Sequence, residues 1–461
     1  MKTVIWFRKD LRIFDNPALT AGIEKGADTA LFFVTPKQWQ QHDMAPIQAD
    51  FIIRHLKLLK VQLAAYDIEL KVVQVDDFNA QVEYIVSHHK NDSLLANIEL
   101  LLNEKLRDQQ IINRGLNLTL FADDCIVPAG SVLNGQGQMF KVFSPFKRAW
   151  LKHVLHQGLQ VTSVPEGKVL PTTDENELFD EFEIQRRDSS RWPLADQVLQ
   201  DVLPNFFQFK LRGYHENRDF PGIKGTSGLS PYFAIGTLSA RAIASQLIQS
   251  KPELLENPNY PEFAWLNELI WRDFYLHLIY HYPNLCKHQN FNDKYDKLAW
   301  PNNDKWFKAW CEGKTGYPIV DAAMKQLLDT GWMHNRLRMI VASFLTKHLR
   351  CDWRLGEKFF MQHLIDGEFA ANNGGWQWSA STGCDAQPYF RVFNPILQSQ
   401  KFDPQGTFIR KYCQELKQVP DKHIHFPHEY LAKQGRQKDY CPAIVEHKSA
   451  RLAALEFYKQ A

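Results

Sequence analysis

The sequence lacks the features that mark membrane, disulfide-rich and strongly charged proteins. No apolar run approaches the roughly 18 residues of a membrane-spanning helix, and the apolar run at residues 3–7 is too short for a signal peptide. The seven cysteines form no C-x-x-C pair, which disfavours zinc and an extracellular disulfide framework. Because 54 Lys and Arg nearly balance 52 Asp and Glu, overall charge gives no argument for nucleic acid. We therefore expect a cytoplasmic protein with no metal and no membrane partner.

The first part of the chain has the pattern of a parallel α/β domain. A length of 461 residues, 44% of them hydrophobic, allows two or three domains with substantial cores. Short apolar runs alternate with helix-compatible segments, and one such segment follows the start signal Asp15-Asn16-Pro17. The apolar runs are residues 3–7, 30–34, 69–75 and 118–122. This alternation predicts a Rossmann-like α/β domain with a parallel sheet at residues 1–130.

The second half of the chain predicts helices only. Residues 131–205 have a weaker pattern, with prolines and an acidic segment around residues 174–183, and we expect a connector there. From residue 206 to 461 helical periodicity predominates, which predicts an all-α C-terminal domain. The clearest helical segments are residues 263–282, 320–328, 332–349 and 353–364.

Residues 331–395 concentrate charges and large aromatics where a helical core would normally carry Leu, Ile and Val. Asn335 and Met339 are one helical turn apart with Arg338 beside them, so one helix can present an amide, a thioether and a guanidinium to a cavity. Asp366 could balance Arg338, although a structural ion pair between helices explains the same residues. The run predicts a site for a large aromatic cofactor.

Two further clusters support a ligand site. The run Gly225-Thr226-Ser227-Gly228-Leu229-Ser230-Pro231 places hydroxyls and glycines before a helix, as in a pyrophosphate site or in an ordinary helix N-cap. In residues 265–275, Glu268, Trp271 and Arg272 share one side of a helix. A carboxylate between two tryptophans is typical of a ligand pocket, and the alternative is an amphipathic helix with a charged edge.

Taken together, these motifs resemble the DNA photolyase/cryptochrome family over residues 3–450. The resemblance rests on residues 6–12, 225–230, 265–275, 313–318, 332–339 and 366–378. Within the family, the chain most resembles bacterial class I cyclobutane pyrimidine dimer photolyases that carry a folate antenna. The resemblance implies an α/β antenna domain, a connector and an all-α domain that binds FAD and DNA, and we expect a monomer.

The resemblance also implies which residues contact the flavin. The cofactor-binding positions are Tyr214, Thr226, Ser227, Gly228, Leu229, Ser230, Trp265, Arg272, Arg338, Asp366, Gly367, Glu368 and Asn372. Glu368 stands where many relatives have Asp, and Gly228 where some have Arg, so the grip on the flavin can differ in detail. Trp300, Trp353 and Trp376 match the tryptophan chain that carries an electron to the photoexcited flavin.

For the substrate, the resemblance implies a cavity that receives a flipped-out pyrimidine dimer. The matching residues are Arg218, Glu268, Trp271, Asn335, Arg336, Met339 and Trp378, with Glu268 hydrogen-bonding the pyrimidine edge. The reaction is electron donation from light-excited FADH⁻ to the dimer, which splits, and electron return. Arg218, Arg336, Arg391 and Lys401 are candidates for DNA phosphate contacts.

An antenna site is implied at five positions: His42, Asn103, Glu104, Cys286 and Lys287. In folate-type relatives these positions hold 5,10-methenyltetrahydrofolate, with a carboxylate that orients the pterin. A deazaflavin antenna is the alternative.

Three rival functions remain within the family. A (6-4) photolyase carries histidines at the positions of Asn335 and Met339, and neither is present here. A signalling cryptochrome usually has a long C-terminal extension and often replaces the residue at Asn372. A DASH-type cryptochrome acting on single-stranded DNA shares most flavin residues and is the closest alternative.

Overall fold

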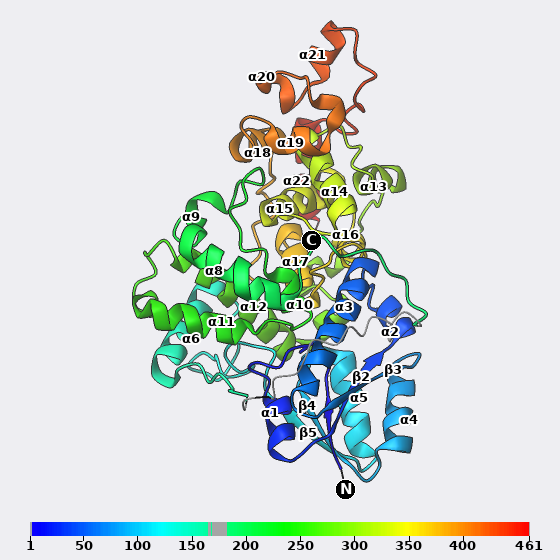
Figure 1. The fold of residues 1–461 in the computed structure, drawn as a ribbon. Helices are drawn as coiled ribbons and strands as arrows, with labels where there is room; N and C mark the ends of the chain where they lie inside the picture. Colours follow the sequence, from blue (N-terminus) through cyan, green and yellow to red (C-terminus); the bar gives the residue numbers. More distant parts are fainter. Residues whose placement is uncertain (1, 165–166, 168–181, 461) are drawn as a thin grey trace. The chain divides into compact units, whose positions relative to one another are not determined.

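The computed structural model describes residues 2–164, 167 and 182–460 (Figure 1). These residues divide into two compact units. The described residues of unit 1 fall in 1–212, 227–287 and 365–370, and those of unit 2 in 213–226, 288–364 and 371–461. Most of the predicted acidic segment around 174–183 lies outside the described residues. The predicted boundaries at 130 and 205 stay predictions.

Unit 1 begins with a parallel sheet, which in the described residues has five strands in the order β3-β2-β1-β4-β5. The strands are β1 (Thr3–Trp6), β2 (Thr29–Val34), β3 (Glu69–Gln74), β4 (Ser93–Asn97) and β5 (Asn117–Phe121). Every residue of β2 is buried, as expected for a strand covered on both faces. Four strands confirm the predicted ones. The sequence analysis missed β4, because only three apolar residues lie between Ser93 and Asn97.

The helices between the strands begin at signals that the sequence carries. They are α1 (Pro17–Glu24), α2 (Pro36–Gln41), α3 (Pro46–Ala64), α4 (Phe78–His88) and α5 (Leu102–Asn113). The Asn16 side chain accepts a hydrogen bond from the backbone N–H of Leu19 at 3.1 Å, which confirms the predicted helix start. Because β1 pairs with both β2 and β4, the strand order reverses there, and open α/β sheets bind ligands outside the carboxyl ends of the strands at such a point.

The rest of unit 1 is helical. It contains α6 (Phe143–Gln157), α7 (Ala195–Gln197), η1 (Val198–Val202), α8 (Leu203–Asn205), η2 (Phe206–Lys210), α10 (Ser230–Ala234), α11 (Ala240–Ser250), η3 (Pro252–Leu255), α12 (Phe263–His281) and η4 (Pro283–Lys287). Buried Asp273 on α12 accepts from the backbone N–H groups of Ile126 and Val127 and from Trp150 Nε1, at 2.9, 3.0 and 2.8 Å. One carboxylate therefore fixes α12 to α6 and to the loop after β5.

The regular secondary structure of unit 2 is helical in all its described residues. Its elements are α9 (Tyr214–Asn217), η5 (Asp293–Lys297), α13 (Asp304–Cys311), α14 (Pro318–Thr330), α15 (Asn335–Ser343), η6 (Phe344–His348), α16 (Trp353–Met361), α17 (Phe369–Ala380), α18 (Pro395–Phe402), α19 (Thr407–Tyr412), η7 (Gln414–Leu416), α20 (Asp421–Ile424), α21 (His428–Lys433) and α22 (His447–Lys459). No described helix of either unit is long and apolar enough to cross a membrane.

One predicted helix of unit 2 starts later than expected. The pattern predicted a helix at 332–349, but α15 starts at Asn335 because His334 is its N-cap, with Nδ1 accepting from the backbone N–H of Arg336 at 3.2 Å. Gly331 ends the preceding helix in the left-handed region, at φ 70°. The two caps place Asn335 at the start of a helix, where its side chain is exposed.

Candidate functional site

Unit 1 holds one group of the predicted flavin residues. The loop from Ser227 to Ser230 leads into α10, and Ser230 Oγ donates to Asp366 Oδ2 at 2.7 Å. Gln48 Nε2 donates to the carbonyls of Ile365 and Gly367, at 3.1 and 2.9 Å. Two segments that are far apart in the sequence, 227–230 and 365–368, are therefore held together, as the predicted cofactor set requires.

Arg272 and Trp265 of this group both lie on α12. Arg272 Nη1 donates to the carbonyl of Asp124 at 2.9 Å. Burial and, to a lesser extent, the Glu99 carboxylate raise the pKa of the Asp124 carboxyl to about 7, although Arg272 acts to lower it. Trp265 is buried against Phe206 and Phe207, with ring centroids 5.3 and 5.7 Å away. Arg272 is thus fixed by the segment that follows β5, while Trp265 is fixed by core packing.

The donor set of this group suits a dinucleotide such as FAD. Ser227 and Ser230 offer hydroxyls, Arg272 offers a guanidinium for phosphate, and Asp366 and Glu368 offer carboxylates for hydroxyl or ring N–H groups. Gly228 has φ 70°, in the left-handed region, and open space where a Cβ would lie. A bulkier residue such as the Arg of some relatives would have room there but would strain the backbone.

Unit 2 holds the other predicted flavin residues: Tyr214, Thr226, Arg338 and Asn372. Arg338 Nε donates to the carbonyl of Met333 at 2.8 Å, and Asn372 Nδ2 donates to the carbonyl of Glu357 at 3.0 Å. Tyr214 is buried. The predicted pairing of Arg338 with Asp366 stays a prediction, because the two residues belong to different units.

The three predicted redox tryptophans all belong to unit 2. Trp353 is fully buried and donates from Nε1 to Asn290 Oδ1 at 3.0 Å. Trp376 is 2% exposed, and its ring centroid lies 5.0 Å from that of Phe360. Trp300 is partly exposed and packs on Phe457 of α22, 5.0 Å between centroids. Exposure rises at Trp300, which suits the surface end of an electron chain.

A glycine on α16 makes room for one of these rings. A Cβ at Gly356 would lie 2.1 Å from Cη2 of Trp376, closer than atoms can approach. Trp353 lies one turn before this glycine on the same helix. The same helix therefore carries Trp353 and leaves space for Trp376, two of the predicted redox tryptophans.

The predicted substrate residues are also divided between the units. In unit 1, Trp271 stacks on Phe143 with centroids 3.6 Å apart and planes 7° apart, and Glu268 lies on the same helix, α12. In unit 2, α15 carries Asn335, Arg336 and Met339. On α17, Trp378 is partly exposed whereas Trp376 is buried.

Three of the predicted antenna residues, His42, Asn103 and Glu104, lie together in unit 1, where α2 follows β2 and α5 follows β4. His42 Nε2 lies 2.8 Å from the amide nitrogen of Gln38 and 2.9 Å from that of Asn103. This nitrogen is therefore the acceptor, and Nδ1 carries the proton, 3.7 Å from Glu104 Oε1. Burial lowers the pKa of His42 to about 4, so the ring is neutral at pH 7.

Glu104 of this group has an unsatisfied oxygen. Its side chain is buried, and within the described residues Oε2 has no hydrogen-bond partner. Burial raises the pKa of Glu104, and the Glu99 carboxylate raises it further, whereas Lys9 lowers it. Cys286 and Lys287 lie on η4 of the same unit. Burial raises the pKa of the Cys286 thiol, and a hydrogen bond with the backbone of Leu102, at the start of α5, acts to lower it. A buried, unpaired carboxylate oxygen is what a ligand with N–H donors would satisfy.

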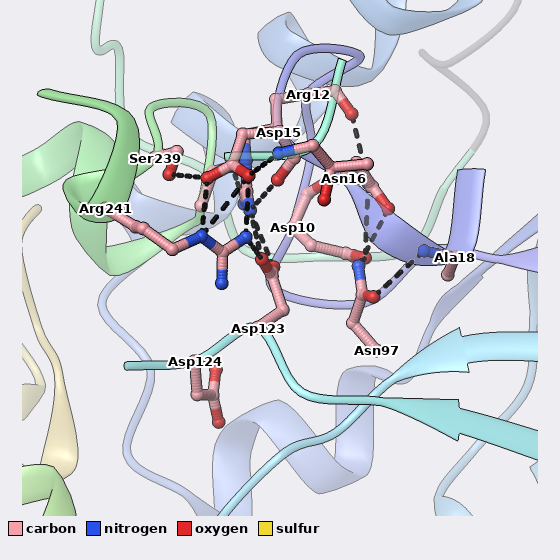
Figure 2. Close-up of polar contacts among 12 residues, drawn as sticks. Asp10, Arg12, Asp15, Asn16, Ala18, Asn97, Asp123, Asp124, Ser239 and Arg241 are labelled. Atoms are coloured by element: carbon pink, nitrogen blue, oxygen red, sulfur yellow. Dashed lines mark hydrogen bonds and ion pairs between the residues drawn. The ribbon is translucent and has the colours of Figure 1, made fainter. Parts of the chain in front are cut away.

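A buried ionic cluster, which the sequence analysis missed, joins the start of the chain to α11 (Figure 2). Arg12 Nη2 donates to Asp123 at 2.6 Å, and Arg241 Nη2 donates to Asp15 at 2.7 Å and to Asp123 at 3.0 Å. Ser239 Oγ also donates to Asp15 (Figure 2). The run 6–12 includes Arg12, but its ionic partner Asp123 lies 111 residues away, so no local pattern could reveal the pair. The cluster links the sheet to the helices that follow the 227–230 loop.

Comparisons with known proteins cover both units. Residues 3–167 match the family model of DNA photolyase, and residues 265–460 match the FAD binding domain of DNA photolyase. A deoxyribodipyrimidine photo-lyase of Vibrio cholerae is 47% identical over 474 residues, covering 99% of this chain and 99% of the relative. One of Escherichia coli strain K12 is 44% identical over 469 residues, covering 99% and 98%.

Solved structures with the same fold include two photolyases and one cryptochrome. A class III photolyase of Agrobacterium tumefaciens is 32% identical with a TM-score of 0.78, covering 100% of this chain and 97% of that one. An archaeal photolyase of Sulfolobus tokodaii with two FAD molecules is 28% identical with a TM-score of 0.80, covering 100% of both chains. A cryptochrome of Synechocystis sp. PCC6803 is 26% identical with a TM-score of 0.84, covering 99% of both.

Proposed function

This chain belongs to the DNA photolyase family, and we propose how its residues divide the work of that enzyme. It binds FAD and uses light to repair cyclobutane pyrimidine dimers in DNA. FAD, when bound in its reduced form, supplies the light-excited electron that splits the dimer. The residues of the chain bind, orient and insulate the reacting groups.

The flavin contacts that we propose form two sets of residues, the first on the phosphate side of FAD and the second on its ring and ribose side. Ser227, Gly228, Leu229, Ser230 and Arg272 bind the phosphate side, together with Tyr214, Thr226 and Trp265. Arg338, Asp366, Gly367, Glu368 and Asn372 contact the ring and ribose side. The observation that supports this assignment most directly is the hydrogen bond from Ser230 to Asp366, because it joins a hydroxyl of the first set to a carboxylate of the second.

For the substrate, we propose that Glu268 orients the flipped-out dimer by accepting from the pyrimidine edge. Trp271, already stacked on Phe143, and Trp378 provide flat apolar walls. Asn335, Arg336 and Met339 of α15 contact the lesion or its phosphates, and so does Arg218. Trp300, Trp353 and Trp376 relay an electron that keeps the flavin reduced.

For the antenna, we propose 5,10-methenyltetrahydrofolate held by His42, Asn103, Glu104, Cys286 and Lys287. The unpaired Oε2 of buried Glu104 supports this assignment, because a pterin offers N–H donors to a carboxylate. The Sulfolobus tokodaii photolyase was solved with two FAD molecules, which implies a novel light-harvesting cofactor in that protein. Extraction of the pigments and mass spectrometry distinguish a folate from a second FAD.

We further propose that the enzyme is a cytoplasmic monomer. The seven cysteines are free thiols, which supports a reducing compartment. Size-exclusion chromatography with light scattering tests the oligomeric state.

The test of the proposed function is a repair assay with purified, FAD-loaded protein. A single thymine dimer is placed either in duplex or in single-stranded DNA, and dimer loss is measured in the dark and under blue light. We expect loss only under light, with duplex DNA repaired at least as fast as single-stranded DNA. Repair restricted to single strands would favour the DASH-type cryptochrome, and bound flavin without any repair would favour a photoreceptor.

A further inference from the structure

We propose that Asp219 determines the selectivity of this enzyme for damaged DNA by restraining Arg336 and Arg218. The inference rests on the proposed DNA-binding role of these two arginines. All residues that carry it belong to unit 2.

Arg336 is held on three sides by its own unit. Its Nη2 lies 2.8 Å from Asp219 Oδ2, and its Nη1 donates to Met339 Sδ at 3.6 Å. The guanidinium carbon lies 4.4 Å from the ring centroid of Phe402, within cation–π distance. Only 19% of the Arg336 side chain is exposed, whereas the preceding residue on α15, Asn335, is exposed. A guanidinium held in this way has one orientation and reduced freedom to reach a phosphate.

The same carboxylate faces the second arginine. Asp219 Oδ1 lies 4.0 Å from Arg218 Nε, so one negative charge is shared between two cations. The Arg218 guanidinium carbon is 5.4 Å from the ring centroid of Tyr214, one of the proposed flavin residues. Asp219 is 32% exposed and therefore adds a negative charge to the surface that these arginines form.

The position of Asp219 is itself fixed. The next residue, Phe220, donates its backbone N–H to the carbonyl of Asn217 at 3.1 Å, and its ring packs edge-on against Phe402 at 6.4 Å. Phe402 thus supports both the arginine and the segment that carries its carboxylate partner. The ion pair is a built feature of this surface and does not depend on two long side chains meeting in solvent.

The consequence concerns the ratio of the affinity for dimer-containing DNA to the affinity for undamaged DNA. Undamaged DNA attracts the protein through its phosphates alone, and a carboxylate beside Arg336 weakens that attraction. A dimer gains base-side contacts in addition, and these require α15 to present Arg336 and Met339 in a fixed arrangement. Asp219 therefore lowers non-specific binding more than specific binding, which raises the specificity ratio.

The experiment measures dissociation constants in the dark for two duplexes of one sequence, one with a single dimer and one undamaged. Wild type is compared with Asp219→Asn over about 50 to 200 mM salt. For undamaged DNA we expect binding to tighten by about three- to tenfold and the salt slope to steepen by about one unit, as for one added phosphate contact. The ratio of the two affinities should fall by at least about threefold.

The matched control is Asp421→Asn. Asp421 Oδ1 also pairs with an arginine of unit 2, Arg410 Nη2, at 2.7 Å, so the variant loses the same unit charge and the same kind of pair. Its specificity ratio should remain at the wild-type value. In an Arg336→Gln background, Asp219→Asn should lose most of its effect, because Asp219 acts mainly through Arg336, 2.8 Å away, and less through Arg218, 4.0 Å away.

An unchanged ratio of the two affinities in Asp219→Asn would overturn the inference, and equal weakening of both complexes would in addition indicate a purely structural role. A wild type that shows no preference for dimers would instead contradict the proposed function. FAD absorbance and thermal unfolding verify that each variant is folded. Should Asp219→Asn not fold, Arg336→Lys decides, because it keeps the charge but loses the fixed orientation: lowered discrimination with retained non-specific affinity is expected, and unchanged discrimination refutes the inference.

Discussion

The carboxyl edge of the sheet in unit 1 and the tryptophan core of unit 2 are organised by opposite physical rules. At the sheet edge, buried charges satisfy one another, as Arg8 does with Asp108 at 2.8 Å and Arg107 with Glu99 at 2.9 Å. In the tryptophan core, shape is decisive, as the missing Cβ of Gly356 shows. The sheet edge should therefore be sensitive to charge and pH at constant volume, and the tryptophan core to volume at constant charge.

The largest effect should follow from removing volume in unit 2. Trp353→Ala leaves a cavity in a fully buried site and orphans Asn290 Oδ1, so we expect a loss of about 4 to 5 kcal/mol in the free energy of unfolding. Trp353→Phe should lose less than half as much unfolding free energy as Trp353→Ala, but it should no longer photoreduce oxidised FAD. Urea unfolding and flavin absorbance under light measure the two effects.

The matched control removes an exposed aromatic. Phe209 is 69% exposed, and Phe209→Ala should change stability by no more than about 0.5 kcal/mol. If Trp353→Phe photoreduced FAD at the wild-type rate, the ring would be only a packing residue.

A change of charge without a change of volume should be almost as costly in unit 1. Asp15→Asn removes one of the two carboxylates, Asp15 and Asp123, that balance Arg12 and Arg241, and it leaves the volume unchanged at a site with 0% exposure. Because an uncompensated buried charge remains, we expect a loss of about 3 kcal/mol in the free energy of unfolding. Asn tolerates the left-handed φ of 52° at this position, so backbone strain does not confuse the result. An unfolding midpoint equal to that of wild type would contradict the proposed contrast.

The next prediction concerns pH. Burial raises the pKa of Asp124 from 3.8 to about 7, so the folded state binds the proton more tightly than the unfolded state. The contribution of Asp124 to stability is therefore present at low pH and is lost as pH rises from about 4 to about 7. The amide oxygen of Asp124→Asn can still accept from Leu100 N–H. The unfolding free energy of this variant should therefore rise relative to that of wild type by a few kcal/mol between pH 5 and pH 8.

The difference between the two proteins is the quantity to measure, because His42 acts in the opposite direction. Burial lowers the pKa of His42 to about 4, so its contribution to stability grows as pH rises from about 4 to 6.5. Both proteins contain His42, and it cancels in the difference. A difference in unfolding free energy that is the same at pH 5 and pH 8 would show that Asp124 does not titrate as described.

The smallest effect on stability is expected at the antenna site. Glu104→Gln removes an unsatisfied buried carboxylate oxygen, so stability without antenna should stay within about 1 kcal/mol of wild type or rise. Bound folate should fall at the same time, because the oxygen that orients it is lost. Folate absorbance of protein loaded at equal folate concentration checks this, and full occupancy in Glu104→Gln would remove Glu104 from the antenna site.

The contrast also explains what the sequence could predict. Four of the five described strands and the start of α1 follow from apolar runs and the Asn16-Pro17 signal, because these are local. Residues 331–339 and 366–378 are dense enough to be recognised as a site, and the family resemblance assigned them roles. The Arg12, Asp15, Asp123 and Arg241 cluster was missed, because its partners come from separate elements and a lone charge in a sequence looks like a surface charge. Asp219 was missed for the same reason.

The central claim is that one residue set binds the flavin and another engages the dimer, and Glu268→Ala tests it most directly. The measurement is the light-dependent repair rate per bound FAD. We expect FAD content at the wild-type level and repair lowered by about tenfold or more, as for one lost charge-assisted hydrogen bond to substrate. Asp366→Ala, in contrast, should release FAD. Repair by Glu268→Ala at the wild-type rate would contradict the claim.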